Sequence, residues 1–270
     1  MARTKRRLGQ HFLTDPRILA RIADATGAAP GDTVVEIGPG PGGLTAALAA
    51  TGARVVAIEK DADLVPALRA RFPGSTIIEA DALEIDWRAA AAPPAGSAGA
   101  FVVAGNIPYN ITTPLIDKAL TPPRPSRIVF LVQKEVADRV AAVPGIANYG
   151  ALSVGVQAAA RVERLFGVPA GAFSPAPKVD SAVLRLTPLA DPLVGDADRA
   201  QFRTMVVGLF GLRRKQLLRA VRELTGWSAD RANSVLQRVA IAPAARSETL
   251  DPARFAQLYR ALVDEGWESG

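Results

Sequence analysis

One segment of the sequence is suited to chemistry on an aromatic amino group, and it consists of Asn106, Ile107, Pro108 and Tyr109. An exocyclic amino nitrogen such as adenine N6 is a poor nucleophile because its lone pair is delocalised into the ring. The Asn106 side-chain oxygen and the Ile107 carbonyl could accept both amino hydrogens and hold them out of the ring plane. Pro108 stiffens the backbone, and Tyr109 offers a face on which a base can stack. The alternative is an ordinary turn with a core tyrosine.

A glycine-rich loop occupies residues 36–43, upstream of that segment. Gly38, Gly40 and Gly43 have the spacing G-x-G-x-x-G, and Glu59 follows 21 positions after Gly38. An acid at that distance is expected to bind ribose hydroxyls. The pattern fits a nicotinamide dinucleotide nearly as well as S-adenosylmethionine, and a tight strand-to-helix turn without a ligand would share it.

Glu36 and Asp81 favour S-adenosylmethionine over a dinucleotide. Glu36 precedes the glycines, where it would repel a pyrophosphate but attract the sulfonium and ammonium groups of S-adenosylmethionine. We expect Glu59 to accept hydrogen bonds from both ribose hydroxyls and Asp81 to accept one from the adenine amino group. The alternative for Asp81 is a helix N-cap. All three are predicted at the carboxyl ends of parallel strands, where open α/β sheets bind ligands.

Short apolar strands that alternate with helices must position these residues. We expect strands over 33–37, 54–59, 75–81, 101–104 and 127–132, and helices over 15–27, 43–51 and 63–72. A helix over 151–160 and strands over 162–168 and 182–186 follow. The alternation predicts an α/β fold with a parallel, doubly wound, Rossmann-like sheet. With S-adenosylmethionine as the ligand, such a sheet is expected to be of the class I methyltransferase kind.

The sequence changes character near residue 190, where strands give way to helical periodicity. We therefore predict a cofactor-binding methyltransferase domain over 1–190 and a small helical, RNA-binding domain over 191–270. The net charge is +6, and from Arg199 to Arg222 there are seven basic residues and no acidic one. Arg3, Lys5, Arg6 and Arg7 add a second basic cluster. Such clusters suit a phosphate backbone, although a compositional bias would explain the net charge alone.

The composition excludes several other classes of protein. There is no cysteine, which excludes disulfides and thiolate catalysis, and the single histidine, His11, cannot anchor a histidine-rich metal site, so we expect no metal. No stretch approaches the ~18–20 uncharged apolar residues of a membrane span. No apolar segment follows the basic N-terminus as in a signal peptide. We therefore expect a cytoplasmic protein.

Six motifs in order resemble the KsgA-type ribosomal RNA adenine dimethyltransferases. They are Gly9-Gln-His-Phe-Leu13, the loop 36–43, Asn106-Ile-Pro-Tyr109, Gln133-Lys-Glu135, Tyr149-Gly150 and Phe173-Ser-Pro-Ala-Pro-Lys-Val-Asp-Ser181. The resemblance spans roughly residues 3 to 220. It implies S-adenosylmethionine-dependent dimethylation of N6 in two adjacent adenines near the 3′ end of small-subunit (16S) rRNA. The implied partner is that rRNA in an assembling ribosomal subunit. We expect no membrane association and expect the chain to act as a monomer.

The resemblance also implies roles for individual residues. The cofactor pocket would contain His11, Leu13, Gly38, Gly40, Glu59, Asp81 and Asn106. Phe173 would stack on a flipped adenine opposite Tyr109, the alternative being a core phenylalanine. His11 stands where the family usually has asparagine, which leaves the cofactor contact there open.

The predicted RNA-binding residues are Arg213, Arg214, Lys215, Arg219 and Arg222. The first three belong to the segment 210–215, which matches the family's basic motif, and Arg219 stands where an asparagine often follows it. Lys215, Arg219 and Arg222 are spaced to share one helix face. Four apolar residues would face the core, namely Leu217, Leu218, Val221 and Leu224.

Three other functions share part of this pattern. A large-subunit rRNA adenine methyltransferase of the macrolide-resistance type would have the same fold and cofactor, but the segment 178–181 and the Arg-Arg-Lys run favour the small-subunit enzyme. A nicotinamide dehydrogenase would need a hydride-handling acid, and none is evident. A non-enzymatic RNA-binding factor would not need the intact Asn106–Tyr109 segment.

Overall fold

The computed structural model describes residues 11–92 and 101–268. The basic residues predicted at positions 3–7, and Gly9 and Gln10 of the first motif, lie outside the described residues. The chain forms two compact units, the first from Met1–Ala137 and Val162–Pro188, the second from Asp138–Arg161 and Leu189–Gly270. Within the described ranges, every helix is too short or too polar to cross a lipid bilayer.

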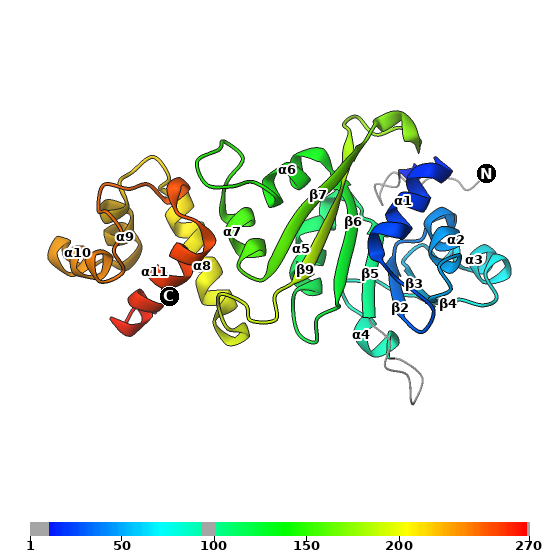
Figure 1. Ribbon diagram of the computed structural model, residues 1–270, viewed down its shortest axis with the longest axis horizontal. Coiled ribbons are helices and arrows are strands. Elements are labelled where there is room, and N and C mark those ends of the chain that lie inside the picture. Colours follow the sequence, from blue (N-terminus) through cyan, green and yellow to red (C-terminus); the bar gives the residue numbers. More distant parts are fainter. Residues whose placement is uncertain (1–10, 93–100, 269–270) are drawn as a thin grey trace. The chain divides into compact units, whose positions relative to one another are not determined.

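A seven-stranded sheet forms the centre of the first unit, with strand order β4-β3-β2-β5-β6-β9-β7 (Figure 1). The strands are β2 (Thr33–Ile37), β3 (Arg54–Glu59), β4 (Thr76–Glu79), β5 (Phe101–Asn106), β6 (Arg127–Gln133), β7 (Ala160–Val168) and β9 (Ser181–Pro188). The pairs from β4 to β6 are parallel. This confirms the α/β prediction and the positions of the strands.

Strand β9 corrects the prediction of an entirely parallel sheet, because it pairs with β6 in the antiparallel direction. A run of buried apolar residues looks the same in either direction, so the sequence pattern cannot indicate strand direction. The middle of the sheet is tightly packed. A Cβ added at Gly105 in β5 would lie 2.5 Å from the Ile37 carbonyl oxygen of β2.

Helices alternate with the strands of this sheet along the chain. They are α1 (Pro16–Thr26), α2 (Gly43–Ala49), α3 (Val65–Arg71), α4 (Trp87–Ala90), α5 (Thr112–Ala119) and α6 (Lys134–Val140), whose last three residues belong to the second unit. Helix α1 packs on β5 and β6 beside α2 (Figure 1). Asp15 caps it by accepting hydrogen bonds from the backbone N–H groups of residues 17 and 18, and Gly27 ends it at φ 60°. The predicted helix over 15–27 is thus confirmed, whereas the sequence analysis did not predict α5 or α6.

The second unit has an apolar helical core. Its helices are α7 (Ala151–Gln157), α8 (Arg199–Gly211), α9 (Leu217–Thr225), α10 (Ala229–Arg238) and α11 (Pro252–Asp264). Leu217 and Val221 are buried, and Leu218 and Leu224 pack against the same core, as predicted.

The structure groups residues 138–161 with this helical unit, whereas the sequence analysis placed them in the first domain. Tyr149, Val154 and Ala158 belong to the apolar core of the helical unit, and two hydrogen bonds also join this stretch to it. The Tyr149 hydroxyl donates to the Leu250 carbonyl at 2.7 Å. The Gly145 amide donates to the Glu248 carbonyl at 2.9 Å. The predicted boundary near residue 190 lies beside Leu189, where the chain enters the second unit for the last time.

Candidate active site

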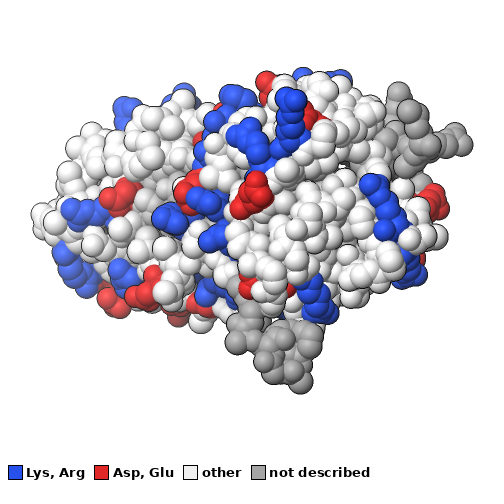
Figure 2. All heavy atoms as spheres, turned by 45° about the vertical axis from the view of Figure 1, so that its right-hand side comes forward, with Lys and Arg blue, Asp and Glu red and all other residues white. Residues whose placement is uncertain are grey.

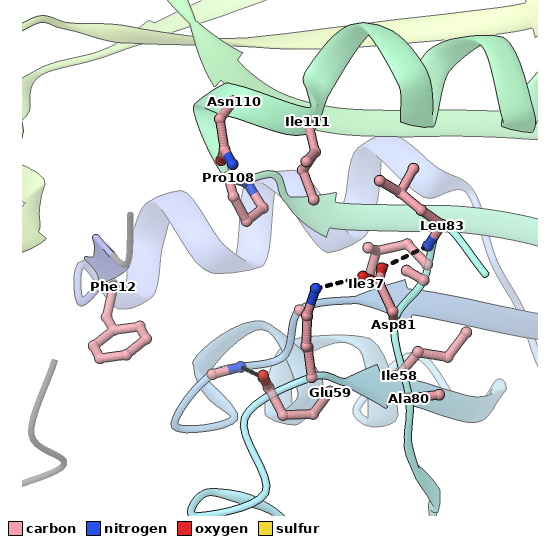
Figure 3. A pocket seen from close by; sticks show the side chains of 14 residues that line it. Phe12, Ile37, Ile58, Glu59, Ala80, Asp81, Leu83, Pro108, Asn110 and Ile111 are labelled. Atoms are coloured by element: carbon pink, nitrogen blue, oxygen red, sulfur yellow. Dashed lines mark hydrogen bonds and ion pairs between the residues drawn. The ribbon is translucent and has the colours of Figure 1, made fainter. Parts of the chain in front are cut away.

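A pocket of about 320 Å³ lies at the carboxyl ends of β2, β3, β4 and β5 (Figure 3). This volume is within the range typical of small-molecule sites. The lining residues come from the last residues of these strands and from the segments that follow them, together with Phe12 of the N-terminal region. They are Phe12, Ile37, Gly38, Gly40, Ile58, Glu59, Lys60, Ala80, Asp81, Ala82, Leu83, Pro108, Asn110 and Ile111. The predicted residues Gly38, Gly40, Glu59 and Asp81 are therefore together in one pocket.

The glycine loop is held against the Glu59 carboxylate. Gly40 has φ 56°, a conformation that side chains rarely adopt. A Cβ there would lie 2.9 Å from the Phe12 ring. The Gly40 amide donates to Glu59 Oε2 at 3.0 Å, and the Asp61 amide donates to Oε1 at 2.8 Å. Each carboxylate oxygen can accept a second hydrogen bond, so Glu59 keeps acceptor capacity for ribose hydroxyls. Burial raises the pKa of Glu59.

Asp81 is a charged acceptor on the same side of the pocket as Glu59 (Figure 3). Its Oδ2 lies 2.5 Å from Lys60 Nζ, and its Oδ1 accepts from the Leu83 amide at 2.9 Å (Figure 3). The hydrogen bond from Lys60 lowers the pKa of Asp81, so its carboxylate is ionised near neutral pH. A turn follows Asp81, and the next helix is capped by Asp86. The structure therefore favours the acceptor role over the helix N-cap.

The structure overturns the electrostatic argument based on Glu36. Glu36 is 1% exposed and does not line the pocket. Thr45 Oγ1 donates to its Oε2 at 2.6 Å. Burial raises the pKa of Glu36 to about 8, so the side chain is mostly neutral at pH 7 and cannot select between a sulfonium and a pyrophosphate. The alternation of side chains along β2 accounts for the error, because Ile37, not Glu36, contributes to the pocket.

The pKa of Glu36 predicts a pH dependence of stability. The folded protein holds a proton on Glu36 from about pH 4.5 to 8, whereas the unfolded chain releases it near 4.5. The free energy of unfolding should therefore fall as pH rises through this window. Glu36→Gln should remove that contribution and flatten the profile, as measured by urea unfolding at pH 5, 6.5 and 8. Equal slopes for the wild type and Glu36→Gln would contradict it.

The predicted catalytic segment follows β5. Asn106 Nδ2 donates to the His11 carbonyl at 2.8 Å. Because a carbonyl can only accept, this bond fixes the amide orientation and leaves Asn106 Oδ1 as an acceptor. The Ile107 amide donates to the Leu131 carbonyl at 3.0 Å, which holds the segment to β6. The Tyr109 hydroxyl lies 3.0 Å from Ser181 Oγ of β9, and burial raises the pKa of Tyr109.

A short strand before α1 reaches both the pocket and the catalytic segment. This strand, β1 (Phe12–Leu13), pairs antiparallel with β8 (Phe173–Ser174). Phe12 lines the pocket, whereas the predicted cofactor residues His11, Leu13 and Asn106 do not. The His11 ring stacks on Tyr109, and Leu13 is buried in the core. Side chains alternate along a strand, so the residue between His11 and Leu13 faces the cavity.

The structure does not support the predicted stacking role of Phe173. Its side chain is 5% exposed and belongs to the same apolar cluster as Leu13. A flipped base needs an exposed ring face, and a ring this deeply buried offers none. The alternative of a core phenylalanine is what the structure shows.

Some pocket residues were missed in the sequence analysis, although each adjoins a predicted one. Lys60 follows Glu59, Leu83 follows Asp81 by two positions, and Asn110 and Ile111 continue the catalytic segment. The signal for them was their place in the loops after the strands. Nothing in their residue types marked them out.

The predicted RNA-binding residues lie in the second unit, and three of them are engaged by carboxylates. Arg213 Nη2 lies 2.8 Å from Glu248 Oε2. Glu223 accepts from Lys215 Nζ at 2.6 Å and from Arg219 Nε at 2.9 Å. Figure 2 likewise shows acidic side chains next to several of the basic groups on the face it presents. Arg214 and Arg222 are exposed, with no ion pair found among residues 11–92 and 101–268.

The sequence has many relatives of one kind. The family model described as ribosomal RNA adenine dimethylase matches residues 1–263. Proteins from Geobacter metallireducens and Caulobacter vibrioides, both named ribosomal RNA small subunit methyltransferase A, are similar to this chain. The first is 44% identical over 269 residues and covers 98% of this chain and 97% of the relative. The second is 43% identical over 264 residues and covers 96% and 97%.

Solved structures share the fold over almost the whole chain. A dimethyladenosine transferase from Plasmodium falciparum has a TM-score of 0.81 and 26% identity, covering 95% of this chain and 98% of that one. The 23S rRNA methyltransferase ErmE has a TM-score of 0.70 and 28% identity, covering 93% and 99%. The predicted class I methyltransferase fold is thereby confirmed. By sequence and by structure, the chain belongs to the ribosomal RNA adenine dimethylase family.

Proposed function

We propose that this protein transfers methyl groups from S-adenosylmethionine to adenine N6 in small-subunit rRNA and dimethylates two adjacent adenines near its 3′ end. The observation that carries the proposal is the Asn106 amide, which the His11 carbonyl orients beside a pocket built at the ends of β2 to β5. The names of the relatives, which are small-subunit enzymes at 43–44% identity, support the choice of rRNA.

The pocket fits S-adenosylmethionine in size and in its donor set. Glu59 would accept from the ribose hydroxyls and Asp81 from the adenine amino group, while the bonds to Gly40 and Leu83 keep each carboxylate in place. Phe12 supplies an aromatic wall. When bound, S-adenosylmethionine supplies the methyl group that is transferred.

The catalytic segment would act on the amino group of the target base. Asn106 Oδ1 and the Ile107 carbonyl accept its two hydrogens, which localises the nitrogen lone pair toward the methyl carbon. Tyr109 would stack on the base. The nitrogen becomes acidic only after it is alkylated, so its proton can leave to water and no base is needed before the attack.

The large-subunit alternative has one specific observation in its favour, the structural similarity to ErmE. Methyl incorporation from labelled S-adenosylmethionine into purified, unmethylated small and large subunits distinguishes the two. The proposal expects label in the small subunit and in its adenines as N6,N6-dimethyladenine. Label confined to the large subunit would establish the alternative, and label in neither would overturn both.

We propose that the helical unit binds this rRNA, with the chain acting as a monomer on a partly assembled subunit. The segment 199–222 supplies the basic residues. Arg214 and Arg222 are exposed and form no ion pair among the described residues, whereas Arg213, Lys215 and Arg219 would have to leave Glu248 and Glu223 first.

The difference between the unpaired and the ion-paired basic residues predicts how rRNA binding depends on salt concentration. Replacing Arg214 and Arg222 with alanine should weaken binding to the small subunit and lower the slope of log K against log[salt] by about 2. Cofactor affinity should not change. The double variant Arg238→Ala/Arg254→Ala, on α10 and α11, makes the same change in net charge and is the control. An equal slope for the Arg214/Arg222 variant and the wild type would assign these side chains to an ordinary solvated surface.

A further inference from the structure

His11 contacts both functional side chains of the catalytic segment. Its carbonyl accepts from Asn106 Nδ2 at 2.8 Å, and its ring stacks on Tyr109 with centroids 5.8 Å apart at 26°. Its Nδ1 lies 2.9 Å from the Pro175 carbonyl. We propose that His11 is a positioning residue for Asn106 and Tyr109, and that it governs the rate of methyl transfer rather than the affinity for the cofactor. The inference rests on the proposed function, and it differs from the cofactor contact that the family resemblance implies.

The pairing of β1 with β8 sets the direction of the His11 carbonyl. Main-chain hydrogen bonds recur at every second residue of an antiparallel pair. The Thr14 amide donates to the Ala172 carbonyl across this pair at 2.9 Å. His11 directly precedes Phe12, so the alternation of main-chain directions along β1 places the His11 main-chain groups on the side away from β8. The His11 carbonyl is therefore directed outward, where the Asn106 amide meets it.

The His11 side chain makes two further contacts, a hydrogen bond to the Pro175 carbonyl and a stacking contact with Tyr109. The Pro175 carbonyl can only accept, so Nδ1 carries the proton of that hydrogen bond. The ring then lies along the face of Tyr109, whose hydroxyl is bonded to Ser181. Each ring is thus fixed by one polar contact and by the other ring. A base stacking on Tyr109 would meet a ring of defined orientation.

Three substitutions separate the two side-chain contacts. His11→Phe keeps an aromatic ring for Tyr109 but cannot donate to Pro175. His11→Asn keeps an N–H donor but has no ring. His11→Ala has neither. Single-turnover methyl transfer at saturating cofactor and small subunits should fall about 10- to 100-fold in His11→Ala, because small displacements of reacting groups cost rates of this order. The other two variants should fall between it and the wild type.

Cofactor affinity is the readout that separates positioning from binding. Calorimetric Kd values for S-adenosylmethionine should stay within about threefold of wild type in all three variants. Phe12→Ala, at the neighbouring residue that lines the pocket, is the comparison and should weaken cofactor binding. Thermal unfolding verifies that each variant is folded.

The outcomes are distinct. His11→Ala transferring methyl groups within about threefold of the wild-type rate overturns the inference. The inference is also overturned if His11→Ala weakens cofactor binding but leaves the rate of methyl transfer unchanged. Should His11→Ala fail to fold, wild-type rates in both His11→Phe and His11→Asn overturn it instead. A wild-type protein that methylates no rRNA would overturn the proposed function and, with it, the inference that rests on it.

Discussion

Asn106→Ala is expected to lower the rate of methyl transfer on the order of 10²–10³-fold, the scale for losing one preorganised polar group. As the amino nitrogen attacks the methyl carbon, it becomes more positive, and its hydrogens become better donors to Asn106 Oδ1. An interaction that strengthens along the reaction raises the rate more than it raises ground-state affinity. Single-turnover transfer to purified small subunits is the measurement.

The structure adds a second variant to this test. Asn106→Asp retains an acceptor oxygen but cannot donate to the His11 carbonyl, so it should also be slow. Asn148→Ala, an exposed asparagine in the second unit, is the control. Binding to the small subunit should survive in all three. If Asn106→Ala methylates within about threefold of wild type, Asn106 is only structural and the catalytic interpretation of the segment is wrong.

Glu59→Ala should weaken S-adenosylmethionine binding by about 1–3 kcal/mol, because it removes the hydrogen-bond acceptor for the ribose hydroxyls. The same change leaves the Gly40 and Asp61 amides without their partner, so the loop should lose order and the melting temperature should fall too. Glu59→Gln keeps one acceptor oxygen, so its cofactor affinity and its melting temperature should lie between those of Glu59→Ala and the wild type. Calorimetric titration and thermal unfolding give both quantities.

Glu79→Ala is the matched control for Glu59, since Glu79 ends the neighbouring strand β4 and is exposed. It should bind the cofactor as the wild type does. Tight binding of NAD together with no binding of S-adenosylmethionine would contradict the assignment of the pocket. Titration with each ligand is needed to decide between S-adenosylmethionine and NAD, because Glu36 is buried outside the pocket and does not discriminate between them.

Features set by short-range rules could be predicted from the sequence. The limits of α1 follow from an N-cap at Asp15 and a left-handed glycine at Gly27. Glu59 and Asp81 come together because the carboxyl ends of parallel strands meet at one edge of a sheet. The strand positions in the first unit follow from runs of apolar residues. In these cases the residues that determine the structure lie within a few positions of the element they determine.

Features set by distant contacts could not be predicted. Whether His11, Phe12 or Leu13 faces the pocket depends on pairing with β8, about 160 residues further along. The proton on Glu36 depends on complete burial, which outweighs the opposing hydrogen bond from Thr45. The basic segment ended one residue before Glu223, so its charge looked uncompensated until the fold placed that carboxylate beside Lys215 and Arg219.

The two compact units have a consequence for synthesis on the ribosome. Each unit is formed from two separate stretches of the chain. Residues 138–161 of the helical unit are therefore synthesised before residues 162–188 of the sheet unit. The sheet unit cannot acquire β9 until residue 188 has emerged, and α7 then waits for α8 and α11. The usual order, in which an N-terminal domain folds before the next one is made, is therefore not open to this chain. A nascent chain stalled near residue 160 would expose the unpaired edge of β6, the kind of edge that promotes aggregation.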